Sequence, residues 1–381
     1  MNTRRKFLKS AAVTAAMSPF IGAARPMWAD IQDQHAPVDV SGAQSLRAHA
    51  EAHGLLVGCA VVPERLNKEP RYARVVAAQA NILVAENAMK WKALRPAPDK
   101  FDFSGADAIL AFASAHGQKV RGHNLCWHEA LPDWFAATVT KENARQILTD
   151  HIKTVAGRYA GKLQSWDVVN EAIDTKSDLP DGLRRSPWFE LIGPDYIDIA
   201  FRTARQADST ALLTYNDYGI ETDTPDQAKK RAQVLELVRG MKKRGVPIDA
   251  VGVQSHLGAT DQAPGNGLRD FVRELRRMRL RVFITELDVN ERKLEGAEAE
   301  RDAAVARIYK DYVTMMVAEP NVDAVLTWGI TDRYTWLNGP KFSRPDGKPQ
   351  RCLPFGTDYQ PTPAFFALRA ALDSRPANMH T

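Results

Sequence analysis

The chain of 381 residues is 44% hydrophobic and 25% charged, which is ordinary for a soluble globular protein and allows a large core. The net charge is only +5, and Lys and Arg are spread among Asp and Glu, so we expect no nucleic-acid partner. No stretch approaches the roughly 18 apolar residues that span a bilayer. The odd cysteine count, without paired spacing, excludes a disulfide scaffold and a zinc site: Cys59, Cys126 and Cys352.

The first residues have the pattern of an export signal. Arg4-Arg5 is followed by Phe7-Leu8 and Lys9, and then by a weakly apolar run of small residues over Ala11–Ala24. This resembles a twin-arginine signal, with cleavage near Ala29. The alternative, a disordered basic tail, does not explain this order of residues. We therefore expect a signal over 1–29, a linker over 30–41, one folded domain over 42–375 and a tail over 376–381, in a periplasmic or secreted protein.

After the linker, apolar strand-like runs alternate with amphipathic helical segments. The eight expected strands are Leu55–Val61, Asn81–Ala85, Lys119–Trp127, Ser165–Asn170, Ala211–Asn216, Ala250–Ser255, Arg281–Leu287 and Ala324–Ile330. The expected helices include Ala106–His116, Lys141–Tyr159, Tyr196–Ala207, Pro225–Arg244, Leu268–Arg279 and Glu298–Val317. Four glycines lie at or near the ends of such helices, where a left-handed cap favours glycine: Gly117, Gly161, Gly240 and Gly245.

Eightfold alternation of strand and helix predicts an α/β protein with a closed (β/α)8 barrel. An open, doubly wound sheet is the alternative fold. That fold favours a Gly-rich phosphate-binding turn after the first strand, whereas this chain has Val62-Pro63-Glu64-Arg65 there. The barrel is therefore the preferred prediction.

Polar residues follow seven of the expected strands. In a (β/α)8 barrel these strand ends meet at the face that carries the active site. Any one of them has a simpler explanation, such as a helix cap or an ion pair, but seven together predict a polar cleft with tryptophans. They include Glu86-Asn87 with Lys90, His123 with Trp127-His128, Asn170-Glu171, Asn216-Asp217-Tyr218, Gln254-Ser255-His256, Thr285-Glu286-Leu287-Asp288, and Trp328 with Asp332 and Trp336.

Glu171 and Glu286 end the fourth and seventh strands, which face each other across such a barrel. Two carboxylates suit glycoside hydrolysis: one protonates the leaving oxygen and the other attacks the anomeric carbon, at a separation of roughly 5–5.5 Å in retaining enzymes. Repulsion between them is expected to raise the pKa of the acid. We expect His256 and Asp288 to orient the nucleophile, and Asn170 to bond a sugar hydroxyl.

Several tryptophans suit a carbohydrate ligand. Trp127, Trp328 and Trp336 are expected to lay their faces against sugar C–H groups while their indole N–H groups bond hydroxyls. Trp91 and Trp166 are better explained by core packing, and Asp167 is expected to belong to the scaffold with Trp166.

A metal-dependent hydrolase is an alternative. His123 and His128 lie five residues apart on one expected strand, so their side chains are expected on opposite faces and not around one ion. We expect no metal and no cofactor.

The same motifs, in the same order, resemble glycoside hydrolase family 10, the endo-β-1,4-xylanases, over about Gly54 to Leu372. They are Ala85–Trp91, Arg121–His128, Trp166–Ala172, Tyr215–Tyr218, Gln254–His256, Thr285–Asp288 and Trp328–Asp332. The resemblance implies retaining hydrolysis of xylan or xylo-oligosaccharides, with Glu171 as acid/base and Glu286 as nucleophile. It implies sugar-binding or supporting roles for Glu86, Asn87, Lys90, His123, Trp127, Asn170, Gln254, His256, Trp328 and Trp336. We expect the protein to be a monomer.

One departure bears on substrate binding. Trp127-His128-Glu129-Ala130 stands where the family commonly has Trp-His-Ser-Gln, and Ala130 cannot make the sugar contact of a glutamine. Two other functions stay open at this point. One is a related barrel glycosidase for β-glucan or mannan, and the other is a carbohydrate-binding barrel without catalysis.

Overall fold

The structure is a computed structural model that describes residues 38–179 and 181–376. The expected export signal over 1–29 lies outside the described residues, as do residues 30–37 of the expected linker and 377–381 of the expected tail. In the described part of the chain, no helix is both long and apolar enough to cross a bilayer.

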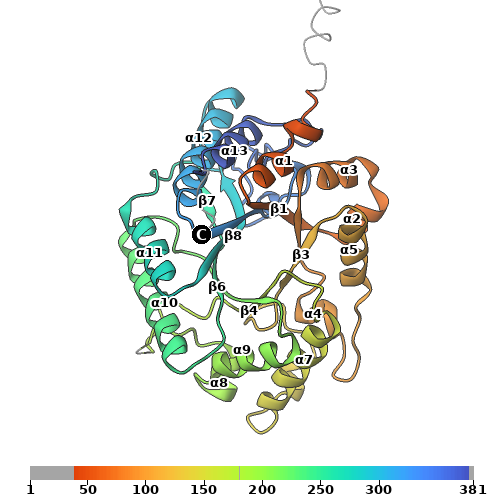
Figure 1. Cartoon of the computed structure of the whole chain (residues 1–381), viewed down its shortest axis with the longest axis vertical. Coiled ribbons are helices and arrows are strands. Elements are labelled where there is room, and N and C mark those ends of the chain that lie inside the picture. Colours follow the sequence, from red (N-terminus) through yellow and green to blue (C-terminus); the bar gives the residue numbers. More distant parts are fainter. Residues whose placement is uncertain (1–37, 180, 377–381) are drawn as a thin grey trace, which may run out of the picture. The chain divides into compact units, whose positions relative to one another are not determined.

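Eight parallel strands form a closed ring, which Figure 1 shows face-on. They are β1 (Leu56–Val61), β2 (Ile82–Ala85), β3 (Lys119–His123), β4 (Ser165–Asn170), β5 (Leu212–Asp217), β6 (Ala250–Val253), β8 (Arg281–Asn290) and β9 (Val322–Thr327). The β6–β8 and β1–β9 pairings complete the ring. The predicted (β/α)8 barrel is confirmed, and the alternative open sheet is wrong.

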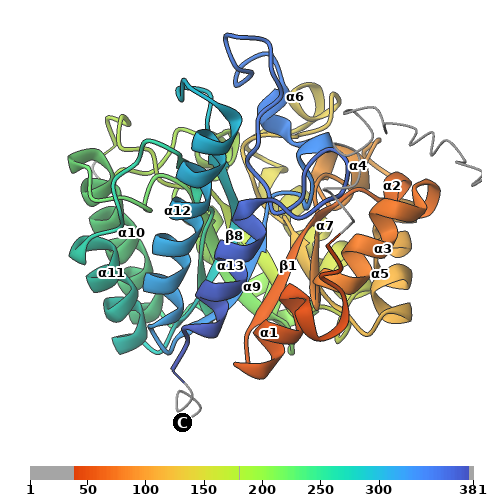
Figure 2. The same ribbon diagram turned by 90° about the horizontal axis from the view of Figure 1, so that it is seen from above.

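Helices follow the strands and surround the ring (Figures 1 and 2). The α-helices are α1 (Leu46–Ala52), α2 (Pro63–Lys68), α3 (Pro70–Gln79), α4 (Trp91–Leu94), α5 (Ser104–Ala115), α6 (Phe135–Thr138), α7 (Ala144–Arg158), α8 (Pro187–Ile192), α9 (Tyr196–Ala207), α10 (Pro225–Lys243), α11 (Asn266–Arg277), α12 (Glu298–Val317) and α13 (Pro363–Asp373). Short 3-10 turns are η1 (Gly42–Gln44), η2 (Asp332–Tyr334) and η3 (Trp336–Asn338). In α9 and α12 the predicted bounds agree with the structure.

Some predicted strand and helix ends were wrong. The expected strand Lys119–Trp127 stops at His123, although Leu125 and Cys126 beyond it are fully buried. An apolar run indicates burial, and these two residues are buried by packing rather than by continuing β3. Gly240 lies three residues before the end of α10, near the helix end as expected. A short strand that was not expected, β7 (His256–Gly258), pairs with the outer part of β8.

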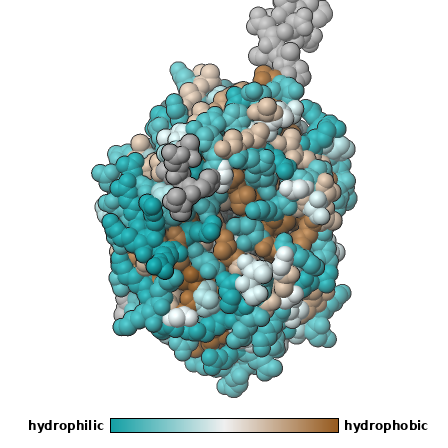
Figure 3. All heavy atoms as spheres, in the orientation of Figure 1, coloured by the Kyte–Doolittle hydropathy of each residue, from teal (hydrophilic) through white to brown (hydrophobic). Residues whose placement is uncertain are grey.

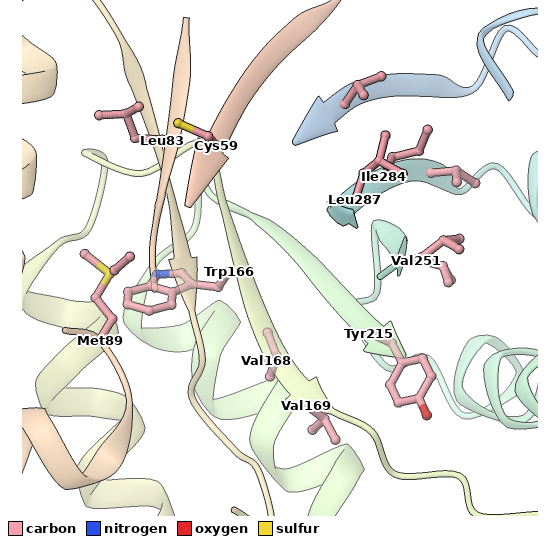
Figure 4. Packing of buried hydrophobic residues seen from close by; sticks show 14 of the residues in the cluster. Cys59, Leu83, Met89, Trp166, Val168, Val169, Tyr215, Val251, Ile284 and Leu287 are labelled. Atoms are coloured by element: carbon pink, nitrogen blue, oxygen red, sulfur yellow. The ribbon is translucent and has the colours of Figure 1, made fainter. Parts of the chain in front are cut away.

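The middle of β4 departs from simple alternation. Val168 and Val169 are consecutive, yet both are buried in the apolar layer between the barrel and its helices, as Figure 4 shows with Trp166 nearby. The pairing of β4 with β5 shifts between Asp167 and Val169, which marks a β-bulge. A bulge re-aims the residues that follow it. It lets Asp167 and Asn170, three residues apart, both form hydrogen bonds with neighbouring barrel strands.

Candidate active site

The predicted site residues meet at the carboxyl ends of the strands, around a cleft of about 590 Å³. In Figure 2 this end of the barrel carries α4 and α6, and α1 lies at the opposite end. Predicted residues that line the cleft are Lys90, His123, Trp127, Asn170, Glu171, Gln254, His256, Glu286, Trp328 and Trp336. Glu86 and Asn87 connect to it through Lys90, whose Nζ donates to Asn87 Oδ1 at 3.1 Å.

Glu286 is held as an ionised carboxylate. Its Oε1 accepts from Asn216 Nδ2 at 2.9 Å, and its Oε2 lies 3.3 Å from His256 Nε2. Burial alone would raise its pKa, but hydrogen bonding from His256 and the charges of His123 and His256 outweigh burial and lower the pKa to about 2. An anionic oxygen at neutral pH is what a nucleophile requires.

His256 connects the two carboxylates of β8. Its Nδ1 lies 3.0 Å from Asp288 Oδ1, while Nε2 faces Glu286. Burial would lower the pKa of this imidazole, but Asp288 and Glu286 together raise it well above its usual value. With both ring nitrogens protonated, His256 donates one hydrogen bond to each carboxylate.

The indole N–H groups of two tryptophans donate to carboxylates of the protein, whereas the sequence predicted that they would bond sugar hydroxyls. Trp336 Nε1 donates to Asp288 Oδ2 at 2.7 Å, and Trp127 Nε1 donates to Glu171 Oε2 at 2.9 Å. Trp336 is still 36% exposed, so its ring face is open to a ligand. These tryptophans therefore fix the carboxylate network while presenting apolar faces to the cleft.

Glu171 is buried at the end of β4, with 9% of its surface exposed. Besides Trp127, its carboxylate accepts from Asn170 Nδ2 at 3.1 Å and from Gln254 Nε2 at 2.9 Å. Its backbone has φ +58, an uncommon conformation for a residue other than glycine, and its N–H donates to Asn216 O. Such strained backbone clusters at functional sites.

The pKa of Glu171 is raised above its usual value, but the expected cause was only partly right. Burial is the largest cause, and the charge of Asp217 raises the pKa more than that of Glu286. Carboxylate repulsion across the cleft is therefore a minor contribution. The raised pKa of Glu171 and the lowered pKa of Glu286 set up one proton donor and one anion in the same cleft.

Two amides connect the glutamates. Asn216 Nδ2 donates to Glu286 Oε1 and also to Asn170 Oδ1, each at 2.9 Å. Asn170 in turn donates to Glu171. Asn216 is the second-last residue of β5, and it was predicted only as one of the polar residues around the cleft, without a specific role. The signal that pointed to it was its place between the acids of β4 and β8.

Asp167 also belongs to the site's support and not only to the scaffold. Its Oδ2 lies 2.9 Å from His123 Nδ1, and its other oxygen accepts from the guanidinium of Arg121 inside the barrel. Both side chains are about 1% exposed. Asp167 thus orients His123, whose charge helps to lower the pKa of Glu286.

Beyond Glu171, the cleft continues past Tyr218, which is 40% exposed. Arg184 Nη2 donates to the Tyr218 hydroxyl at 3.1 Å, and its Nε donates to the backbone oxygen of Glu171. Lys230 lies 3.9 Å from the Tyr218 ring centroid and pairs with Asp217 at 2.7 Å. Sequence reasoning missed Arg184 and Lys230 because they come from a loop and from α10, not from strand ends.

The other tryptophans of the described residues belong to the core or pack against it. Trp91 and Trp166 are buried, as expected, and Trp91 stacks on His151 at 3.6 Å. Trp188 is also buried, and its Nε1 donates to the backbone oxygen of Trp127. Trp134 donates to Arg95 O.

The reason given against a His123–His128 metal pair was wrong, because His128 lies beyond the end of β3. His123 bonds Asp167, whereas His128 Nε2 lies 3.7 Å from Glu129. Burial is the main cause that lowers the pKa of His128 to about 4. In the described residues, no three acidic, histidine or cysteine side chains are grouped as ligands for an ion.

Known proteins are similar to this chain in both sequence and fold. Endo-1,4-beta-xylanase A of Thermoanaerobacterium saccharolyticum is 36% identical over 82% of this chain, and Exoglucanase XynX of Acetivibrio thermocellus is 36% identical over 82%. The chain spans only about a quarter of the length of these two proteins, 26% and 28%. The crystal structure of xylanase 10B from Thermotoga petrophila in complex with xylobiose matches with a TM-score of 0.78 and 34% identity, over 86% of this chain and 97% of that one. Residues 45–371 match the model of Glycosyl hydrolase family 10, so the chain belongs to this family, as its motifs predicted.

Proposed function

We propose that the protein is a retaining endo-β-1,4-xylanase. The observation that carries the proposal is the pair of glutamates with opposite pKa shifts, Glu171 raised and Glu286 lowered, joined by Asn170 and Asn216. The name of the similar xylanase A and the xylobiose in the similar xylanase 10B support xylan as the substrate.

In the first half-reaction, Glu286 attacks the anomeric carbon as the C–O bond to the leaving xyloside breaks. Glu171 gives its proton to the leaving oxygen, so the departing sugar leaves neutral. In the second half, the ionised Glu171 takes a proton from water, the water oxygen attacks the same carbon, and Glu286 leaves as a carboxylate. Two inversions give net retention. The hydrogen bonds from His256 and Asn216 suit Glu286 in its anionic form at the beginning and end of the cycle.

The experiment that tests this proposal compares polysaccharides and follows product stereochemistry. The purified protein is incubated with xylan, soluble cellulose and mannan, and reducing ends are measured. Proton NMR at early times should show the β-anomer of new xylo-oligosaccharide ends. An initial α-anomer would contradict the retaining mechanism. No release of reducing ends from any of the three would favour a carbohydrate-binding barrel.

A second candidate is a β-glucanase with the same glutamate pair. The observation that favours it is the similarity to a protein named exoglucanase. Glucose carries a hydroxymethyl group at C5 that xylose lacks, and Trp328 and Trp336 line the cleft where that group would need space. A higher rate on soluble cellulose than on xylan would favour this candidate.

We further propose that the protein acts outside the cytoplasm, after export through the twin-arginine route. The order Arg4-Arg5, Phe7-Leu8 and Lys9 supports this proposal. Because that route carries folded proteins, the barrel would form before export. Action as a monomer, with no partner besides the carbohydrate, is also part of the proposal.

A further inference from the structure

A second cavity lies at the opposite end of the barrel from the catalytic cleft. Its volume is about 670 Å³, in the range of roughly 300–1,000 Å³ that is typical of ligand sites. Leu56, Lys119 and Arg281, at the amino-terminal ends of β1, β3 and β8, contribute to its wall. The face seen in Figure 3 is largely hydrophilic, with apolar patches nearer its centre.

The cavity gathers positive charge. One carboxylate, Asp323, lines it, and this group pairs with Arg281. Among the described residues, no carboxylate lies within ion-pair distance of the other four cations that line it. These are Lys119, Arg276, Arg279 and Arg375. The expectation that cations are spread and not clustered is wrong here, because barrel closure brings together segments that are more than 250 residues apart in sequence.

Arg279 occupies a backbone position that usually belongs to glycine. It follows α11 with φ +58, and the Leu280 N–H closes the helix end by donating to Leu275 O at 2.9 Å. Glycine adopts this left-handed conformation without strain, whereas an arginine does not. In the described structure, Arg279 forms no ion pair that would offset this backbone strain. The presence of arginine rather than glycine at this position therefore needs an explanation.

Arg375 adds a buried charge. It is 4% exposed, and its guanidinium donates to the backbone oxygens of Val322 and Pro320. Its Nε has no hydrogen-bond partner in the described structure. Burial lowers the pKa of this arginine, and the charge of Asp323 offsets burial only in part. An anion bound in the cavity would stabilise this cation.

We infer that this cavity binds the carboxylates of uronic-acid branches on a polysaccharide, at a site separate from the catalytic cleft. Arginine guanidinium groups match carboxylates with paired hydrogen bonds. The described lining contains no aromatic ring, which disfavours a single-stranded nucleic acid because its bases need a stacking surface. The inference rests on the proposed function, since xylan with acidic branches supplies both a backbone for the cleft and carboxylates for this cavity.

The test measures binding to immobilised glucuronoxylan by depletion from solution, with the Glu286→Gln variant so that the polymer stays intact. Saturating xylotetraose occupies the cleft, and the same polymer with its carboxyl groups reduced is the reference. Adding Arg276→Gln and Arg279→Gly should weaken binding at least fivefold and reduce its salt dependence, because Lys119 and Arg375 remain. The matched control adds Arg307→Gln and Lys310→Gln, two exposed cations on α12 with the same charge change, and should bind like the parent.

The outcomes separate this inference from the proposed function. Equal binding of the cavity variant and its control would overturn the inference, as would equal binding to the carboxyl-reduced polymer. Stronger competition by a DNA oligonucleotide than by oligogalacturonate would reassign the cavity to nucleic acid. Arg276→Gln and Arg279→Gly should leave the rate on a short neutral xylo-oligosaccharide unchanged. If xylan were not cleaved at all while cation-dependent binding persisted, only the proposed function would fail.

Discussion

At the scale of single residues, the two glutamates of the site have different roles. Glu286→Gln keeps the shape of the side chain and an oxygen that accepts from Asn216, but it removes the anionic nucleophile and the oxygen that accepts from His256. We expect kcat on xylan to fall on the order of 10³-fold or more, with little change in folding. Steady-state kinetics and a thermal melt measure the two effects. Near-full activity would show that Glu286 is not the nucleophile.

The acid role of Glu171 should appear in how the loss of activity depends on the leaving group of the substrate. Glu171→Ala removes the proton donor, so poor leaving groups such as xylosides should slow far more than activated aryl glycosides, which need no protonation. The ratio of the two losses, measured as kcat/KM on xylotetraose and on a nitrophenyl xylobioside, is the readout. Equal losses on both substrates would contradict an acid role.

The same residue should set the alkaline limit of activity. Glu171 must be protonated to act as an acid, so kcat/KM should fall as pH rises through its raised pKa; the limb from Glu286, with a pKa of about 2, lies at far lower pH. The hydrogen bond from Gln254 stabilises the carboxylate and lowers the pKa of Glu171. Gln254→Leu should therefore move the alkaline limb to higher pH. A limb that stays in place or moves down would contradict this assignment.

At the scale of elements, strand ends could be predicted but the supports behind them could not. The motifs located Asn170, Glu171 and Glu286, because carboxyl ends of parallel strands converge. Asp167 was assigned to the scaffold because it lies near the beginning of its strand, and no sequence pattern indicates the bulge that follows it. Arg184 lies in a loop whose path no periodicity encodes. Tertiary contacts, rather than a local sequence pattern, determine the supporting roles of Asp167 and Arg184.

The β3–β4 pair allows this support to be tested. Asp167→Asn leaves Arg121 buried without its counter-charge, and loss of one partner of a buried pair costs about 3–5 kcal/mol. We expect urea unfolding at correspondingly lower denaturant concentration. Arg121→Met with Asp167→Leu should recover much of that stability, because it removes both charges.

The double variant also separates stability from function. His123 still lacks its partner at Nδ1 in that variant, so kcat/KM should remain reduced when stability has returned. Recovery of both together would mean that Asp167 contributes only to folding.

At the scale of the whole molecule, the sequence predicted the barrel and its order of strands but not its charge distribution. Eight alternations are a strong local signal, and closure follows from them. The basic cavity depends on which strand starts meet after closure: Lys119 and Arg281 are far apart in the chain and share one wall. Arg276, Arg279 and Arg281 lie close together in the sequence, but the spacing of Lys and Arg along the chain cannot show that Lys119 and Arg375 join them.

The amino-terminal residues make a prediction that concerns the protein's place in the cell. If Arg4-Arg5 is a twin-arginine signal, Arg4→Lys with Arg5→Lys preserves the charge but removes the recognised guanidinium pair. Export should then fall, and activity should accumulate in the cytoplasm at an unchanged specific rate, because the barrel begins far from the substitution. Cell fractionation and enzyme assay measure both. Lys6→Arg is the matched control, since it also retains charge. Equal export of the double variant and the control would contradict the twin-arginine route and favour a basic tail without a sorting role.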